Sequence, residues 1–146
     1  MGKVKSRPRI NIGGVFVSEH SMQRSVIAWA NLMAVRRKPP LRWLYANANG
    51  GDRGGGIRGI VAAGKMNAEG VKRGVPDLFL PVPRGRYHGL YLEMKSERGK
   101  LSSEQKEWLA YLGESGYRTC VAFSVLEATS CILEYLDLPM EPVVAG

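Results

Sequence analysis

The sequence contains few cysteines and histidines and has no long apolar run. Cys120 and Cys131 are the two cysteines, and neither a C-x-x-C pair nor a neighbouring histidine accompanies them, so we expect buried thiols in a reducing compartment and not a zinc site. The two histidines, His20 and His88, are too few for a histidine-based metal site or catalytic triad. A membrane span needs ~20 consecutive apolar residues, and a signal peptide needs an apolar segment behind its first charges. The sequence shows neither feature, so we expect a cytoplasmic protein.

The chain has the size and composition of one globular domain. Its 146 residues are 45% hydrophobic. A chain of this length buries about 70% of its unfolded surface, so folding requires neither disulfides nor a structural metal. The first residues are basic and include Pro8 and the pair Gly13–Gly14, which is typical of an arm and not of a packed element. We therefore expect a basic arm over residues 1–17 and one domain over residues 18–146.

Acidic residues are scarce in the first half of the chain. Residues 1–76 contain fourteen Lys and Arg and three Asp and Glu, whereas residues 77–146 contain seven and ten. The formal charges of the two halves are therefore +11 and −3. Clustered cations gain affinity for a phosphate backbone by releasing its counterions. This distribution favours a nucleic acid as the partner of the surface that the first half forms.

Helix and strand signals follow each other along the chain and predict an α/β fold. Serines open three helices: Ser18, Ser102 with Gln105, and Ser124 with Glu127, the last two as capping boxes. The remaining elements are a helix over residues 57–69, strands over residues 41–46, 78–80, 90–95 and 117–123, and a glycine-rich loop over residues 47–56.

Residues 59–66 fit the G-x-x-x-x-G-K part of a phosphate-binding loop but do not predict nucleotide binding. Met66 stands where a Ser or Thr would bind Mg²⁺, and a glycine-rich loop precedes the segment in place of a hydrophobic strand. We therefore expect no nucleotide cofactor.

Carboxylates on two consecutive predicted strands are the strongest sign of chemistry. Asp77 follows Pro76 at the start of one strand, and Glu93, Met94 and Lys95 lie on the next. Side chains alternate along a strand, so Glu93 and Lys95 share the face opposite to Met94. With Asp77 beside them, two carboxylates converge, which is unfavourable unless a cation such as Mg²⁺ or Mn²⁺ lies between them. Such an ion assists phosphodiester hydrolysis, with Lys95 positioning water or balancing charge, while the alternative is an ordinary solvated strand face.

These motifs resemble those of the PD-(D/E)xK nucleases, and the wider sequence resembles one branch, the VRR-NUC (virus-type replication-repair nuclease) domains. The PD…ExK motif alone is weak, but G-V-x-x-G before it and L-S-x-x-Q after it make the combination specific. The resemblance covers nearly the whole chain after the basic arm. The matching segments are Ser18–Glu19, Asn49–Gly51, Glu69–Leu80, Leu92–Lys95, Leu101–Gln105 and Gly116–Tyr117.

The resemblance implies a restriction-endonuclease-like core, a mixed β-sheet flanked by α-helices, that cuts DNA with Mg²⁺ or Mn²⁺. Carried over by position, Asp77 and Glu93 are metal ligands together with the main-chain carbonyl of Met94. Lys95 is the catalytic lysine.

Two further residues match the family outside the strands. Glu19 matches a helical glutamate that joins the catalytic and metal-binding residues, and it shares a helix face with Met22 and Val26. The alternative for Glu19 is a first-turn acid that complements the helix dipole. Gln105 matches the glutamine after the active-site strand, and it is also the capping-box partner of Ser102. Both roles of Gln105 are compatible.

Basic residues in or beside the glycine-rich segments are candidates for DNA contact, because backbone amides and side chains both reach phosphate there. These residues are Arg53, Arg58, Lys72 and Arg73. The alternative for each is a solvated surface charge.

The resemblance implies a structure-selective endodeoxyribonuclease that acts on branched DNA in repair or recombination, with the four-way (Holliday) junction as the expected substrate. Small stand-alone relatives are viral or bacterial homodimers, so we expect a homodimer in a bacterial cell or a phage-infected host. Val15–Val17 and the proline-rich end of the chain are candidate dimer contacts. The alternatives are a DNA-binding protein without catalysis and a sequence-specific nuclease of the same fold.

Overall fold

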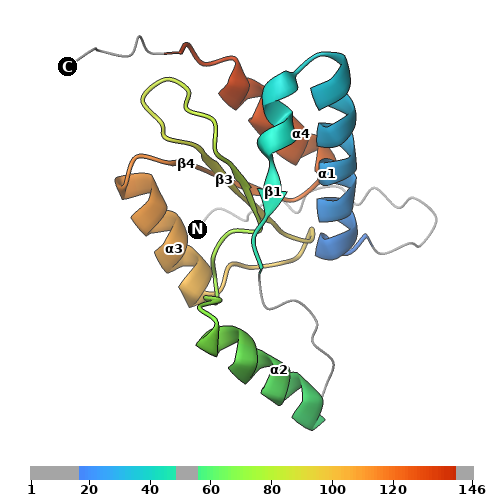
Figure 1. Cartoon of the computed structure of the whole chain (residues 1–146), viewed down its shortest axis with the longest axis vertical. Helices are drawn as coiled ribbons and strands as arrows, with labels where there is room; N and C mark the ends of the chain where they lie inside the picture. Colours follow the sequence, from blue (N-terminus) through green and yellow to red (C-terminus); the bar gives the residue numbers. More distant parts are fainter. Residues whose placement is uncertain (1–16, 49–55, 141–146) are drawn as a thin grey trace, which may run out of the picture.

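A mixed β-sheet lies at the centre of the molecule (Figure 1). The structure, a computed structural model, describes residues 17–48 and 56–140. Within these ranges, β1 pairs with β2 and β2 with β3 in antiparallel fashion, whereas β3 and β4 are parallel. The strands, in their order across the sheet, are β1 (Tyr45–Ala46), β2 (Leu78–Leu80), β3 (Leu90–Met94) and β4 (Arg118–Ala122). This arrangement confirms the expected α/β class.

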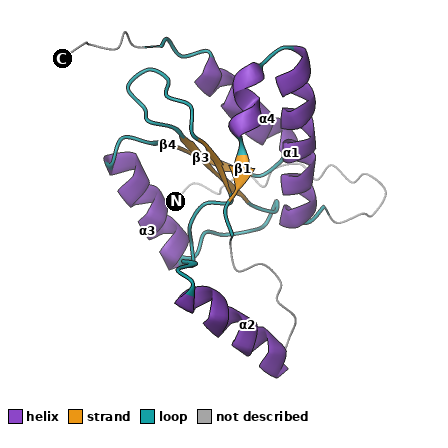
Figure 2. Cartoon of the chain, in the orientation of Figure 1, coloured by secondary structure: helices purple, strands orange, loops and turns teal. Residues whose placement is uncertain are grey.

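Helices cover both faces of the sheet, as Figures 1 and 2 show. Helices α1 (Glu19–Arg36) and α4 (Val125–Leu136) pack against each other and against β3 on one face. Helix α3 (Ser103–Glu114) contacts β4 from the opposite face. A short 3₁₀ helix, η1 (Pro39–Trp43), packs on α1, and α2 (Gly56–Ala68) lies away from the sheet (Figure 1).

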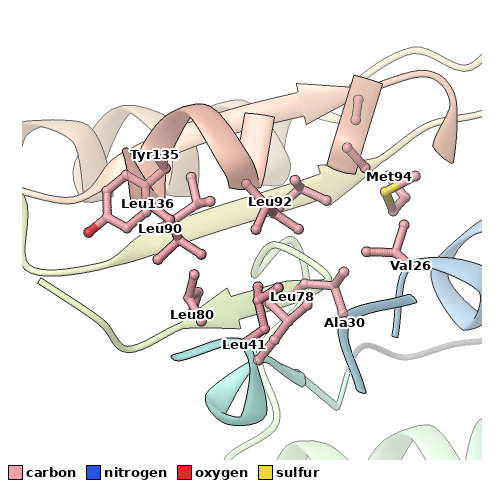
Figure 3. Close-up of a cluster of buried hydrophobic side chains, with 14 of the residues drawn as sticks. Val26, Ala30, Leu41, Leu78, Leu80, Leu90, Leu92, Met94, Tyr135 and Leu136 are labelled. Carbon is pink, nitrogen blue, oxygen red and sulfur yellow. The ribbon is translucent and has the colours of Figure 1, made fainter. Parts of the chain in front are cut away.

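The hydrophobic core lies between the sheet and the α1–α4 face. Alternate residues of β2 and β3 point into it, and burying each such side chain stabilises the fold by about 1.5–3 kcal/mol relative to leaving it exposed. Figure 3 shows these side chains meeting residues of α1 and α4. The buried side chains include Val26, Ala30, Leu41, Leu78, Leu80, Leu90, Leu92, Met94, Tyr135 and Leu136.

Serine caps begin three of the helices, as predicted. The Ser18 hydroxyl accepts from the Ser21 N–H at 3.1 Å, and this bond satisfies one of the free amides at the start of α1. The expected capping box at Ser124 is only half formed. The Ser124 hydroxyl accepts from the Glu127 N–H at 3.0 Å, but the Glu127 carboxylate accepts from the N–H of Phe123, one residue earlier than a capping box requires.

The strand predicted over residues 41–46 is wrong for most of its length. Only Tyr45–Ala46 forms a strand, η1 takes residues up to Trp43, and Leu44 links the two in an extended conformation. Prolines at positions 39 and 40 fix φ near its helical value. Leu41 and Leu44 are both buried at a spacing of three, which is the period of a 3₁₀ helix and not of a strand.

The predicted helix over residues 57–69 is confirmed as α2, while the strands predicted over 90–95 and 117–123 are each slightly shorter in the structure. Of the expected basic arm, residues 1–16 lie outside the described residues, and Val17 is exposed. No helix in the described part of the chain has the length and apolarity needed to cross a bilayer.

Candidate active site

Three polar residues form a row across the end of the sheet. The register of β1, β2 and β3, continued by one residue, places Asn47 opposite Asp77 and Asp77 opposite Glu93. The Asn47 N–H donates to the Asp77 carbonyl at 2.8 Å, and the Asn47 side-chain amide donates to the Pro76 carbonyl at 2.7 Å. These bonds hold the chain before β2 in line with its neighbours. We call Asn47, Asp77 and Glu93 the polar row.

Asp77 joins the start of β2 to the end of β3. Its carboxylate oxygen Oδ2 accepts from the Met94 N–H at 2.8 Å. The Met94 side chain is fully buried in the core, so its backbone is held in place beside the Asp77 carboxylate. The structure therefore holds the Asp77 carboxylate beside the main-chain N–H of Met94, the residue whose carbonyl is an expected metal ligand.

Glu93 is a carboxylate buried inside the protein, with 1% of its surface exposed. Its Oε1 accepts from Gln105 Nε2 at 2.6 Å and lies 3.7 Å from Lys95 Nζ. Among the described residues, no donor reaches its buried Oε2. Burial, and after it the negative charge of Asp77, raise the pKa of Glu93 to about 8, while the positive charge of Lys95 acts in the opposite direction. The buried Oε2 of Glu93, which has no described donor, is suited to bind a cation from solution.

Lys95 follows directly after β3 and shares the face of Glu93, as the alternation along the strand predicted. Its backbone N–H donates to the Ala122 carbonyl at 2.9 Å, which extends the pairing of β3 with β4 by one residue. The residue is 8% exposed, and its ammonium is the positive charge beside Glu93. The solvated strand face considered as an alternative is wrong, because both charged side chains are buried.

Gln105 completes the predicted capping box and also contacts Glu93. Its Oε1 accepts from the Ser102 N–H at 2.9 Å, and its own N–H donates to the Ser102 hydroxyl at 3.1 Å, which completes the capping box of α3. The other end of the same amide donates to Glu93 at 2.6 Å. The backbone N–H of Ser102 therefore orients the amide that holds Glu93.

Glu19 lies at the edge of this group. It is the first residue of α1, and its Oε1 accepts from the Ser96 N–H at 3.0 Å. A Cβ added to Gly99 would lie 3.0 Å from the same oxygen, so the turn after Lys95 passes close to the carboxylate. Glu19 thus fixes the chain that leaves β3, and its negative charge makes a minor contribution to the raised pKa of Glu93.

Of the four candidate DNA contacts, the structure describes the side chains of two. Arg53 lies outside the described residues, and Arg58 is described only as a backbone position of α2. Lys72 and Arg73 are exposed in the segment between α2 and β2. Of the four, these two are therefore placed on the accessible surface of the described chain.

The segment that carries Lys72 and Arg73 is attached to the start of α3. Trp108 donates its indole N–H to the Arg73 carbonyl at 3.1 Å. Gly74 has a φ of +87°, and a Cβ added there would lie 2.6 Å from the backbone of Glu104. Because Glu104 precedes Gln105, this contact places the two cations on the side of the molecule where α3 meets the polar row.

The donor set fits a small, hard cation. Among the described residues, no three His, Cys, Asp or Glu side chains gather into a site that could hold a metal, and Glu19 is not grouped with Asp77 and Glu93. Mg²⁺ commonly uses one or two carboxylates and completes its shell with water and substrate phosphate. Asp77, Glu93 with its unpartnered oxygen, and the Met94 carbonyl supply a set of that kind.

Asn47 is a structural member of the site that the motif analysis missed. It stands two residues before the Asn49–Gly51 segment, in what the sequence indicated only as a polar loop. Its part in the row depends on pairing between β1 and β2, which are separated by more than thirty residues of chain. The register of so short a strand is not apparent in the sequence.

Comparisons with known proteins identify the family and the fold. The family model of the VRR-NUC domain matches residues 17–125. A solved structure described as a VRR_NUC domain protein is 27% identical, with a TM-score of 0.67, and the match covers 84% of this chain and 90% of that one. A search of curated proteins gave no match. The fold, the polar row and these matches together show that the chain belongs to the VRR-NUC family of nucleases.

Proposed function

We propose that the protein is a Mg²⁺- or Mn²⁺-dependent endodeoxyribonuclease that hydrolyses phosphodiesters in branched DNA, with the four-way (Holliday) junction as its substrate. The observation that carries the proposal is the buried carboxylate of Glu93, which has one oxygen without a described donor and lies beside Asp77 and Lys95. Maintaining such a group costs stability. A functional role explains this loss of stability, because the Glu93 carboxylate can hold a metal ion at the phosphate that is cut.

Each residue of the site has a role in this proposal. Asp77, Glu93 and the Met94 carbonyl hold the ion, which, when bound, supplies a more acidic water and stabilises charge on the phosphate. Lys95 positions that water or balances the developing charge. Gln105 orients Glu93, Glu19 holds the chain after Lys95, and neither needs to touch the phosphate.

Exposed cations support DNA as the substrate. Lys72 and Arg73 lie where α3 meets the polar row, and the first half of the chain carries a charge of +11. A junction is cut symmetrically by two active sites, so the protein acts as a homodimer. Exposed Ile60 and Val61 on α2 and exposed Val17 are apolar surfaces available for the contact. A monomeric mass by light scattering, with and without junction DNA, would contradict the dimer.

A panel of labelled linear, flap and four-way DNA, each with Mg²⁺, Mn²⁺ or chelator, tests the activity. We expect cleavage of the four-way junction with either metal and none with chelator. Binding without cleavage of any substrate would favour the non-catalytic DNA-binding protein. Cleavage of linear duplex at one sequence would favour the sequence-specific nuclease.

A further inference from the structure

Aromatic side chains form a second row across the sheet. Tyr45 of β1 pairs directly with Phe79 of β2, and Phe79 pairs directly with Tyr91 of β3. The rings of Phe79 and Tyr91 stack with centroids 4.2 Å apart, and Tyr45 meets Phe79 edge to face at 5.8 Å. We call Tyr45, Phe79 and Tyr91 the aromatic row. The three rings in register form one continuous aromatic cluster, in which Tyr45 lies at the β1 end.

The aromatic row faces away from the hydrophobic core. Its neighbours along the strands, Leu78 and Leu92, are buried in the core, so the alternation of side chains directs the rings to the other face. Gly89 provides room for them, since a Cβ there would lie 2.7 Å from the Phe79 ring. Tyr45 remains 49% exposed. The β1 end of the row is therefore open to a partner.

The aromatic row is adjacent to the polar row on the same face. Asn47, Asp77 and Glu93 each lie two residues from Tyr45, Phe79 and Tyr91, respectively, on the same three strands. The rise of a strand places such rows roughly 6.6 Å apart. A DNA chain whose phosphate lies at the polar row therefore has the aromatic row within reach of its bases.

The geometry points to the aromatic row as a stacking surface for an unpaired base next to the scissile phosphate. This inference rests on the proposed function. An exposed ring stacks on any base, but only a base that has left the duplex stack can reach it. A base at a branch point leaves the stack at a lower cost than a base inside a continuous duplex, so the row favours branched DNA. Three residues before Tyr45 in the sequence, the guanidinium of Arg42 stacks over the exposed ring of Trp43 at 4.9 Å.

Fluorescence of 2-aminopurine tests the stacking directly. The full chain, with Ca²⁺ in place of Mg²⁺ to limit turnover, is titrated with a four-way junction that carries one unpaired 2-aminopurine at the branch. We expect quenching on binding. In Tyr45→Leu, which keeps an apolar side chain but removes the ring, we expect the quenching to be lost and the Kd to rise by about five-fold or more. Tyr45→Phe should restore both, and the Kd for a fully paired linear duplex should not change.

Tyr111→Leu is the matched control, because Tyr111 is also an exposed tyrosine but lies on α3. Quenching that persists in Tyr45→Leu, or an equal loss of affinity for linear duplex, would overturn the inference. A change of oligomeric state in Tyr45→Leu would overturn it too, because the row would then contact a second chain. If wild-type protein cleaves no DNA but Tyr45→Leu still loses quenching, the stacking stands and the proposed activity fails.

Discussion

At the scale of single residues, Glu93 combines burial with a neighbouring negative charge, and its pKa rises from 4.5 to about 8. A group whose pKa is higher in the folded state binds its proton more tightly there, so its stabilising effect is present below pH 4.5 and is lost as the pH rises through about 8. A cation requires the ionised carboxylate, so metal binding competes with this proton.

We therefore expect metal-free protein to lose stability between pH 6 and pH 9, and Mg²⁺ to raise the melting temperature more at pH 9 than at pH 6. Glu93→Gln removes the titrating group and should flatten both dependences. Thermal unfolding with chelator or with Mg²⁺ across this pH range measures them. Identical pH profiles for Glu93→Gln and the wild type would contradict the assignment of the raised pKa to Glu93.

Variants of Ser102 and Gln105 distinguish the capping of α3 from the hydrogen bond that holds Glu93. Ser102→Ala removes the cap hydroxyl and should cost about 1 kcal/mol of unfolding free energy, with cleavage little changed. Gln105→Ala also removes the bond to Glu93 and should reduce cleavage about ten-fold or more, because a charge-assisted bond contributes roughly 1.5–3 kcal/mol. Urea unfolding and cleavage rates, measured on both variants, provide the comparison. Equal cleavage by the two variants would show that Gln105 acts only as a cap.

At the scale of elements, the contact between the segment before β2 and α3 depends on Gly74. Gly74 and Gly70 both have positive φ, at +87° and +95°, but only a Cβ at Gly74 would meet another element. Gly70→Ala should cost about 1–2 kcal/mol for its backbone conformation. Gly74→Ala should cost more, because the backbone of Glu104 must also move. Urea unfolding of the two variants measures the difference, and equal losses would mean that this segment does not pack on α3.

The sequence predicted elements whose signals are local. The serine caps of α1, α3 and α4 and the alternation of β3 each depend on a few neighbouring residues, and so Glu93 and Lys95 were correctly placed on one face. The 3₁₀ helix at residues 39–43 was missed, because the apolar and aromatic residues at positions 41–46 are also typical of a short strand.

The two rows of the sheet were the least predictable features. Asn47 and Tyr45 take their places through pairing with residues far along the chain, and a strand of two residues carries no pattern that fixes its register. The carboxylate pair was inferred correctly because Asp77 and Glu93 belong to consecutive strands.

At the scale of the whole molecule, the uneven charge predicts binding that is sensitive to salt. Each phosphate contact contributes about −0.9 to the slope of log K against log salt concentration. Deletion of residues 1–9, which contain four of the cations, should make that slope shallower while leaving the polar row intact. Fluorescence anisotropy with junction DNA over a series of salt concentrations measures the slope. Affinity that does not change between low and physiological salt would contradict an electrostatic interface.

Cleavage of four-way DNA by Asp77→Asn in Mg²⁺ is the most direct test of whether the polar row is the active site. The substitution keeps the shape of the side chain and removes its charge, so we expect a folded protein that still binds the junction and does not cut it. Lys95→Ala should behave in the same way, whereas Lys106→Ala, an exposed residue of α3, should cleave like the wild type. Undiminished cleavage by purified Asp77→Asn, with contaminating nuclease excluded, would contradict the placement of the active site at the polar row.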